Sequence, residues 1–476
     1  MKKTMLRTLA LVLSLLMVFS LAACQGETEQ TEATEATEAT EATEATEATE
    51  ATEEEPAEVV ELTYSLWGSE AEAANFEAVA AKFHEEYPNI KVTGLVIPWE
   101  NYMEKLNTMA TAGNLPDCGL MQEASTLYWA QAGMLADISS MYGPDDPKPL
   151  DAVAFTYEGA PVAYAVANNS LLMFYNKDMF DAAGLEYPPV TAADAWDWDT
   201  FVDVAKQLTL DANGNNAKSP DFDPENIVQY GCMIENLTWQ LEVWTRSNGS
   251  GFYNEDGTEV TINDAKAIDA IQKIADLHTV HHVAPLSSGL TDDGVPRSII
   301  AGTVAMTTNG AWNIGTCLAD ARNEGLNYGI AVLPYMEEKV TITTGGPNVV
   351  FNQTKHLEET MTFIKWYSRE ENNWDGLIAT GIWMPILDVY YQGGEMTDKW
   401  LKNPNYPEYE SAKAVLVDYV NECAVPTSWM YTSNTSEFNA LLGAVLGDVW
   451  TGATTAEEAI TSNLDALKDA HAGFGA

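Results

Sequence analysis

The stretch that decides the fold begins Val59-Val60-Glu61-Leu62-Thr63-Tyr64-Ser65-Leu66-Trp67-Gly68, an apolar run that ends at a glycine. Short apolar runs bounded by turn residues are typical of buried β-strands. Residues 71–87 then carry apolar side chains at helical spacing, and residues 90–93 predict a second strand after the break at Pro88. Because strands that alternate with helices pack as a parallel sheet covered by helices, the sequence predicts an α/β fold.

The same alternation continues along the chain. A helix is predicted at 99–112, ending at Gly113, and strands are predicted at 117–121 and 171–175. Further helices are predicted at 198–208, 264–278, 357–368 and 455–468, the last of them preceded by the capping box Thr455-Ala456-Glu457-Glu458. The sequence contains no glycine-rich phosphate-binding loop, so nucleotide binding is not predicted.

The charge balance excludes several classes of partner. The chain has 23 basic and 71 acidic residues, a formal net charge of -48. Nucleic-acid binding needs clustered Lys and Arg to replace the counterions of phosphate, so we expect no nucleic-acid partner. The same negative field repels anionic lipid head groups and anionic ligands. We therefore expect a neutral or cationic small molecule as ligand. Neither a cofactor nor a metal is predicted from the motifs of the chain.

The N-terminus has the features of a secretory signal. Three basic residues precede an apolar run over about 9–21. The sequence Leu21-Ala22-Ala23-Cys24 resembles the bacterial lipobox. The resemblance implies that the signal peptide 1–23 is removed and that acyl chains on Cys24 anchor the chain at the extracellular face of the cell membrane. No other stretch is long and apolar enough to span a bilayer.

A low-complexity segment follows the predicted lipidation site. The triplet Thr-Glu-Ala repeats from Thr31 to Ala51, which stacks like charges on successive turns and offers no apolar face to bury. Segment 24–57 is therefore predicted to be a lipidated cysteine with a disordered, self-repelling tether, with a reach on the order of 100 Å at about 3.3 Å per residue. A spacer with no role beyond solubility is an equally good interpretation.

Three segments in a fixed order carry a resemblance to a known family. They are Phe174-Tyr175-Asn176-Lys177-Asp178-Met179-Phe180, residues 301–312 ending in Asn309-Gly310-Ala311-Trp312, and Tyr328-Gly329-Ile330-Ala331-Val332-Leu333-Pro334. They resemble bacterial extracellular solute-binding proteins of the sugar-binding type, the group that includes maltose-binding protein. The likeness runs from about Glu61 to Lys468.

This resemblance implies a two-lobe, periplasmic-binding-protein-like α/β fold with hinge crossovers. Lobe one is placed at 58–167 and 326–366, and lobe two at 168–325 and 367–476. The ligand is expected in the cleft between the lobes, which closes around it because the ligand contacts both lobes only in the closed state. The chain would be a monomer and not an enzyme, and it would deliver a carbohydrate to the permease subunits of an ABC transporter.

The predicted site combines aromatic rings with polar side chains. Aromatic rings stack on the apolar faces of a sugar, while amides and carboxylates bind its hydroxyls. Strand ends and the resemblance together predict these ligand-binding residues: Trp67, Ser69, Glu70, Gln122, Glu123, Asn169, Glu235, Asn236, Trp239, Trp312, Gly346, Trp383, Trp429 and Tyr431. Trp67 ends a strand, where ligands bind in α/β folds, and Trp312 aligns with a stacking tryptophan of the family. Maltose-binding protein differs at Ser69, Glu70 and Asn169, so the ligand need not be maltose.

Other interpretations remain open. A binding protein for a polyamine or peptide would pair carboxylates such as Glu70, Glu123 or Glu235 with ammonium groups. A glycoside hydrolase also needs aromatic subsites and a pair of carboxylates. A surface adhesin would be compatible with the tether.

Two clusters and four cysteines have less specific interpretations. The histidines 278, 281 and 282 lie at a predicted helix end, where cationic side chains suit the helix dipole, and a metal site is the alternative. The run Asp211-x-Asn213-x-Asn215 begins like a calcium loop but lacks its later glycine and glutamate, so a turn is favoured. The remaining cysteines are interpreted as packed thiols, with one or two disulfides left open: Cys118, Cys232, Cys317 and Cys423.

Overall fold

The computed structural model describes residues 59–68, 70–286 and 298–473. The predicted signal peptide, the lipidation site Cys24 and the tether lie outside the described residues, as does Ser69. None of the helices in the described ranges is both long enough and apolar enough to cross a membrane.

The first lobe is built on a six-stranded sheet. Its order is β2-β1-β3-β12-β5-β4, with parallel pairing among the first three strands and antiparallel pairing beyond them. The strands are β1 (Val60–Leu66), β2 (Ile90–Val96), β3 (Cys118–Leu120), β4 (Ala154–Tyr157), β5 (Ala160–Ala165) and β12 (Pro347–Val350). The parallel part contains the stretch that predicted the fold, and the sheet as a whole is mixed.

Helices cover both faces of this sheet. One apolar core contains side chains of α2 (Glu70–Glu86) and α11 (Leu357–Tyr367), including Phe76, Phe83 and Phe363. The core on the other face contains side chains of α3 (Tyr102–Ala112) and α4 (Glu123–Gln131). The short α12 (Glu370–Asn373) contacts α2.

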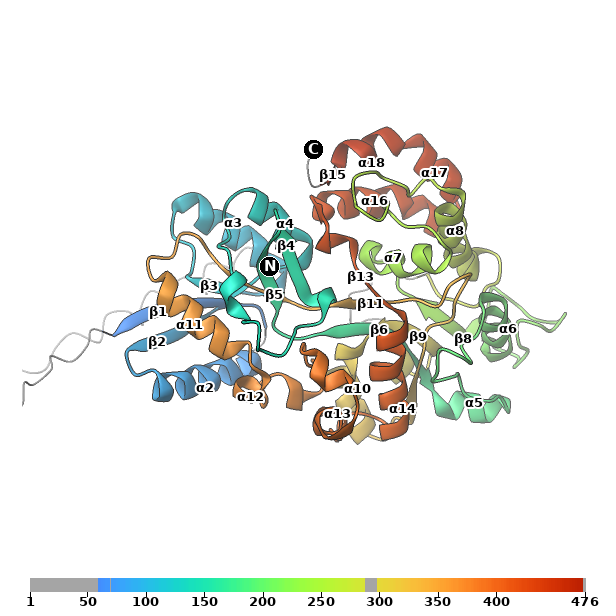
Figure 1. Cartoon of the computed structure of the whole chain (residues 1–476). Coiled ribbons are helices and arrows are strands. Elements are labelled where there is room, and N and C mark those ends of the chain that lie inside the picture. The colour runs from blue at the N-terminus through green and yellow to red at the C-terminus, as the bar shows by residue number, and fades with distance from the viewer. Residues whose placement is uncertain (1–58, 69, 287–297, 474–476) are drawn as a thin grey trace, which may run out of the picture. The chain divides into compact units, whose positions relative to one another are not determined.

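The second lobe is built on a seven-stranded sheet. Its order is β13-β11-β6-β9-β8-β7, and β10 also pairs with β6. The strands are β6 (Asn169–Asn176), β7 (Leu210–Asp211), β8 (Ile227–Ile234), β9 (Val304–Gly310), β10 (Tyr328–Ala331), β11 (Thr341–Thr344) and β13 (Ala424–Pro426). Figure 1 shows the two sheets in separate lobes, with α2 and α3 on the first and α6 and α8 on the second.

Every residue of β6 is buried, and its alternating side chains serve two cores. Leu171, Met173 and Tyr175 belong to one core, and Leu172 and Phe174 belong to the other. The continuous apolar run over 171–175 is expected for a strand in a sheet that is covered on both faces.

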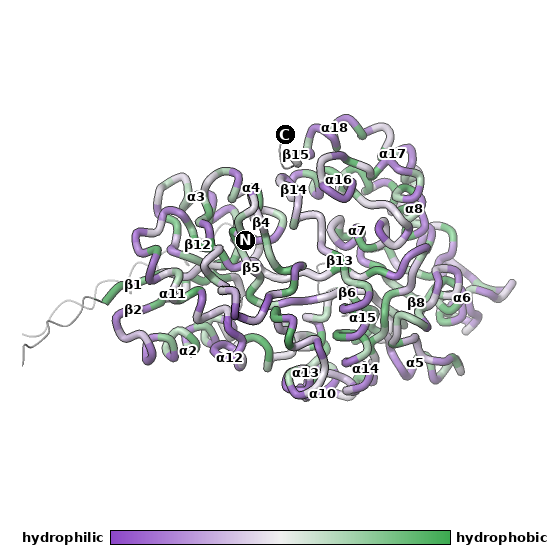
Figure 2. The backbone as a smooth tube through the Cα atoms, in the orientation of Figure 1, coloured by the Kyte–Doolittle hydropathy of each residue, from purple (hydrophilic) through white to green (hydrophobic). Residues whose placement is uncertain are grey.

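The helices of the second lobe divide between these two cores. The first core is covered by α5 (Lys177–Ala183), α6 (Trp198–Leu208), α7 (Thr238–Ser247), α8 (Ala265–Thr279), α16 (Thr435–Trp450), α17 (Ala456–Ser462) and α18 (Leu464–Ala470). The second is covered by α10 (Cys317–Asn323), α13 (Gly394–Leu401), α14 (Tyr409–Lys413) and α15 (Tyr419–Cys423). The outer helices mix hydrophilic and hydrophobic residues along their length, as Figure 2 shows for α8 and α2.

The chain passes between the sheets at points that differ in part from the predicted boundaries. It leaves the first sheet after β5 and enters the second at β6, where the first crossover is predicted. The predicted return at residue 326 is wrong, because β10 and β11 both pair with β6 in the second sheet. The return falls at Gly345 and Gly346, between β11 and β12. A third passage follows α12, since Ile378 already packs in the second lobe.

Two local predictions can be compared with the structure directly. The C-terminal helix predicted at 455–468 is two helices, α17 and α18, with Asn463 between them. Thr455 nevertheless caps α17, because its side chain accepts a hydrogen bond from the Glu458 N–H. The loop at Asp211 forms a turn: its carboxylate accepts hydrogen bonds from the backbone N–H groups of Asn213, Asn215 and Asp223.

The cysteines and the histidine cluster singled out in the sequence can be located in the structure. Cys118, Cys232 and Cys423 are buried thiols. His278 Nδ1 lies 3.0 Å from the backbone oxygen of Ala284, at the end of α8. Within the described ranges, no three His, Cys, Asp or Glu side chains form a group that could hold a metal ion.

Candidate ligand-binding cleft

A cleft of about 720 Å³ is lined by both lobes and by the crossover between them. Its volume lies within the range of small-molecule sites, roughly 300–1,000 Å³. Six of its lining residues are tryptophans, namely Trp67, Trp99, Trp239, Trp312, Trp383 and Trp429. The other lining residues are Gly68, Glu72, Pro98, Gln122, Glu123, Ala124, Thr344, Gly345, Ser436 and Asn439.

The wall from lobe one is formed where three parallel strands end. Trp67 follows β1, Trp99 follows β2, and Gln122 follows β3. The carboxyl ends of parallel strands meet at one edge of a sheet, which is the common position for a ligand in α/β folds. The rings of Trp67 and Trp99 meet edge to face, with centroids 5.0 Å apart and planes at 82°.

Buried polar and aromatic contacts hold Trp67 in place. Its ring also meets Tyr102 edge to face at 5.2 Å, and the Tyr102 hydroxyl oxygen lies 2.8 Å from both its acceptor, the Leu120 carbonyl, and Ser65 Oγ. A Cβ atom at Gly346 would lie 2.9 Å from Trp67 Cζ2. Gly346 therefore contributes space for the indole ring and does not itself line the cleft.

The wall from lobe two is formed by tryptophans at the ends of β8 and β9. Trp312 lies in the turn of 3₁₀ helix η4 (Ala311–Ile314) directly after β9. Its indole packs on Gly310, where an added Cβ would come within 1.8 Å of the ring. Trp239 lies in the first turn of α7, and its ring centroid is 6.1 Å from that of Trp312.

A third ring extends this row. Trp429 lies in 3₁₀ helix η8 (Ser428–Met430), with its centroid 5.6 Å from Trp239 and the two planes inclined at 39°. The tilt between Trp239 and Trp312 is similar, at 37°. The three indoles therefore form a curved apolar surface along one side of the cleft.

The polar groups of the cleft are acidic or neutral. Glu123 begins α4, and its Oε1 accepts a hydrogen bond of 3.0 Å from Thr344 Oγ1 at the crossover. Glu72 lies in α2, with its carboxyl group against Gly68. Among the described lining residues there is no Lys, Arg or His, so an anionic ligand would find no opposite charge here.

Half of the predicted ligand-binding residues line this cleft. They are Trp67, Gln122, Glu123, Trp239, Trp312, Trp383 and Trp429. Glu70 begins α2, but its side chain, like the whole of Ser69, lies outside the described part of the chain. The structure places the other five elsewhere: Asn169, Glu235, Asn236, Gly346 and Tyr431.

Glu235 lies beneath the tryptophan row, not in the cleft. It is 1% exposed, and its Oε2 accepts hydrogen bonds from Gln240 Nε2 at 2.7 Å and Asn309 Nδ2 at 2.8 Å. These bonds join the segment before α7 to the end of β9. Glu235 therefore braces the elements that carry Trp239 and Trp312.

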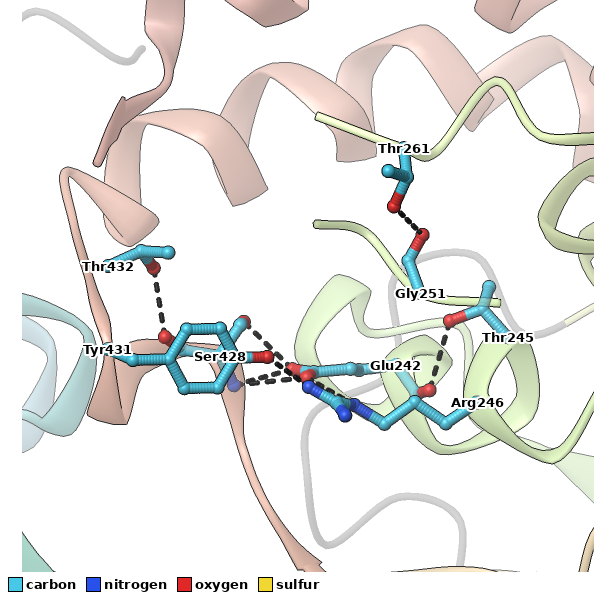
Figure 3. Close-up of polar contacts among 8 residues, drawn as sticks. All are labelled: Glu242, Thr245, Arg246, Gly251, Thr261, Ser428, Tyr431 and Thr432. Atoms are coloured by element: carbon cyan, nitrogen blue, oxygen red, sulfur yellow. Dashed lines mark hydrogen bonds and ion pairs between the residues drawn. The ribbon is translucent and has the colours of Figure 1, made fainter. Parts of the chain in front are cut away.

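The remaining three predicted residues lie in other parts of the second lobe. Asn169 is buried, and its Nδ2 donates to the Ile382 carbonyl at 2.9 Å. Asn236 lines a separate small pocket with His278 and Trp450. Tyr431 lies against Arg246, whose guanidinium donates to the tyrosine hydroxyl (Figure 3).

Several lining residues were not predicted from the sequence. Trp99 follows strand two as Trp67 follows strand one, so the same strand-end rule would have found it. Ser436 and Asn439 come from α16, near the end of the chain. No local pattern in the sequence marks them, because only the tertiary fold brings α16 to the cleft.

Two sheet-based lobes with a ligand-sized cleft between them define the architecture of a solute-binding protein. A family model described as "Bacterial extracellular solute-binding protein" matches residues 78–408. The chain therefore belongs to the bacterial extracellular solute-binding protein family.

Two curated proteins show the sequence similarity expected within this family. The sn-glycerol-3-phosphate-binding periplasmic protein UgpB of Escherichia coli is 22% identical over 412 residues, which are 82% of this chain and 87% of UgpB. The Brucella abortus protein BAB2_0491 is 24% identical over 294 residues, 60% of this chain. The match spans 66% of that protein's length.

The fold is also similar to solved structures. The ABC substrate-binding protein Lmo0181 from Listeria monocytogenes, in complex with cycloalternan, superposes with a TM-score of 0.70 at 21% identity, covering 87% of this chain and 99% of Lmo0181. Maltose-bound MalE3 of T. maritima superposes with a TM-score of 0.67 at 19% identity, covering 86% of this chain and 100% of MalE3. These likenesses establish the two-lobe fold.

Proposed function

We propose that this protein is the substrate-binding component of an ABC importer and that it captures a carbohydrate, either a monosaccharide or an oligosaccharide. The observation that carries the proposal is the row of indole rings across a cleft shared by both lobes. Pyranose rings expose apolar C–H faces that stack on indoles, and their hydroxyls bind carboxylates and amides such as Glu123, Gln122 and Asn439. The solved structures named above, which hold cycloalternan and maltose, support the same ligand class.

The protein would bind its ligand without transforming it. The named relatives and solved structures are binding proteins, and this supports a role in capture, not in catalysis. As part of the same proposal, Cys24 carries a lipid anchor at the outer face of the cell membrane, the protein is monomeric, and permease subunits receive the loaded protein.

A cationic solute such as a polyamine is the second candidate. Glu72 and Glu123 line the cleft, and the described lining has no basic side chain, so an ammonium group would find opposite charge there. An anionic solute such as sn-glycerol-3-phosphate is disfavoured for the same reason, although UgpB is named for binding it.

Thermal unfolding in the presence of three ligand sets distinguishes these proposals. The sets are neutral saccharides from glucose to maltotriose and mannotriose, the polyamines putrescine and spermidine, and sn-glycerol-3-phosphate. A ligand that binds only the folded state raises the melting temperature, with about 2.7 kcal/mol of stabilisation at a hundredfold excess over Kd. We expect a shift with a saccharide. A shift with a polyamine alone would favour the second candidate, and a shift with glycerol phosphate alone would contradict both.

A further inference from the structure

A buried carboxylate in α7 holds the turn that carries Trp429. Glu242 is 2% exposed. The Ser428 N–H donates to its two oxygens at 3.0 and 3.1 Å, and Ser428 Oγ donates to Oε2 at 2.8 Å. Figure 3 shows these bonds converging on one carboxyl group. Glu242 thus fixes the first residue of η8, next to Trp429.

Arg246 supplies the charge that this buried carboxylate requires. Its Nε lies 2.9 Å from Glu242 Oε1, and its guanidinium also donates to the Tyr431 hydroxyl. A buried charge is tolerated only where it is paired and hydrogen-bonded, and both conditions are met here. Because Ser428 is the first residue of η8 and Tyr431 directly follows it, α7 holds this short turn on both sides of Trp429.

Trp429 lies between side chains of the two lobes. Its Nε1 is buried and has no hydrogen-bond partner among the described residues. Its ring is 7% exposed and packs in the lobe-one core with Tyr102 and Met121, while α7 belongs to lobe two. The ring also touches Trp239, one turn before Glu242 on the same helix. Trp429 therefore lies at the point where the lobes meet along the cleft.

We infer that Glu242 and Arg246 are positioning residues for ligand binding, which act through Trp429 without contacting the ligand. The pair keeps the Trp429 and Trp239 rings at a fixed angle, so that both present a continuous surface to the ligand. This inference rests on the proposed function for its affinity readout, but its geometric part can be tested in the ligand-free protein.

Neighbouring indoles give a near-ultraviolet circular dichroism signal that depends on their mutual angle. The Trp429→Phe variant lacks the Trp429–Trp239 pair, so the difference between its spectrum and that of the wild type gives the contribution of this pair. We expect Glu242→Gln and Ser428→Ala to lose most of that part in the absence of ligand. The matched control is Glu370→Gln. Glu370 is 3% exposed and accepts backbone hydrogen bonds from Ile386 and Leu387, but it does not line the cleft.

The second readout is the affinity for a trisaccharide. The ligand is maltotriose or mannotriose, depending on which of them binds the wild type. Glu242→Gln should weaken binding about tenfold, whereas Glu370→Gln should change it less than about twofold, even if both lower the melting temperature. An unchanged dichroism signal in Glu242→Gln, in conditions where Trp429→Phe alters it, would overturn the inference. If the wild type binds neither trisaccharide, the ligand-free spectra decide the inference separately from the proposed function.

Discussion

Trp67 and Trp312 line the same cleft from opposite lobes. Trp67 follows the first strand of the first sheet, and Trp312 follows a central strand of the second. A ligand that stacks on both rings must contact both lobes at once. Such a ligand stabilises the closed arrangement over any open one, because only the closed arrangement offers both contacts.

Replacing Trp312 with alanine should weaken saccharide binding without unfolding the protein. We expect a loss of about tenfold to a hundredfold, equivalent to roughly 1.4–2.8 kcal/mol, as is usual for a central aromatic contact. Trp196→Ala is the matched control, because Trp196 is also partly buried against the lobe-two core but does not line the cleft. Calorimetric titration of both variants gives the comparison, and equal losses in the two would refute a ligand platform at Trp312.

Replacing Gly310 with alanine, which adds a single methyl group, should also weaken saccharide binding. The new Cβ would lie within 1.8 Å of the Trp312 ring, so the indole must move away from its present position. We expect Gly310→Ala to weaken binding by about tenfold or more and to alter tryptophan fluorescence. Gly447→Ala is the control, since an added Cβ meets nothing within 4 Å there. That change in α16 should be neutral or stabilise the protein by about 0.5–1 kcal/mol. Unchanged binding by Gly310→Ala would contradict the packing described here.

Glu370 should make the stability of the protein depend on pH. Burial raises the pKa of its carboxyl group to about 7, despite hydrogen bonds from its own backbone and from Ile386 and Leu387. The folded state therefore holds a proton that the unfolded state releases near pH 4.5. The contribution to stability is full below pH 4.5 and is lost as the pH rises to about 7, at a cost on the order of 3 kcal/mol.

The Glu370→Gln variant isolates this contribution, because the amide stays neutral and can still accept the two backbone hydrogen bonds. Urea unfolding at pH 5 and pH 8 should show a smaller decrease in stability for the variant than for the wild type. A variant that is as sensitive to pH as the wild type over this range would show that Glu370 is ionised throughout.

The charge of the ligand should be evident from the salt dependence of binding. A neutral saccharide carries no net charge for salt to screen, even where its hydroxyls bind Glu123, so its affinity should change less than about twofold between roughly 0.05 and 0.5 M salt. A polyamine would bind more weakly as the salt concentration rises, and Glu123→Gln would weaken it further. Titration at the two salt concentrations, with wild type and Glu123→Gln, separates the two ligand classes.

Local patterns predicted the parts of the fold and the site that depend on strand ends. The strand β1 and helix α2 follow from apolar periodicity, and Trp67 was predicted because a strand ends there. Trp312 was predicted from the resemblance, because it aligns with a stacking tryptophan of the family, and the structure explains the glycine at position 310 by the indole that packs on it. Such features are set by neighbours in the sequence.

Features set by distant parts of the chain could not be predicted in the same way. Glu235 and Glu123 both lie just beyond strands, but one is buried beneath the tryptophans and the other faces the cleft. Glu235 is held in the buried position by hydrogen bonds from Gln240 of α7 and Asn309 of β9, which the sequence pattern does not reveal. The predicted boundary at 326 failed for a related reason, since the pattern of β10 does not reveal that its partner is β6.

Oxidative footprinting of the indole side chains, with and without the saccharide that most stabilises the protein, tests the central claim most directly. The chain contains 14 tryptophans, and mass spectrometry can follow the oxidation of each one. We expect the ligand to protect Trp67, Trp99 and Trp312, with no change at Trp196. Protection confined to tryptophans outside the cleft, or absent from both Trp67 and Trp312 at saturating ligand, would contradict the account.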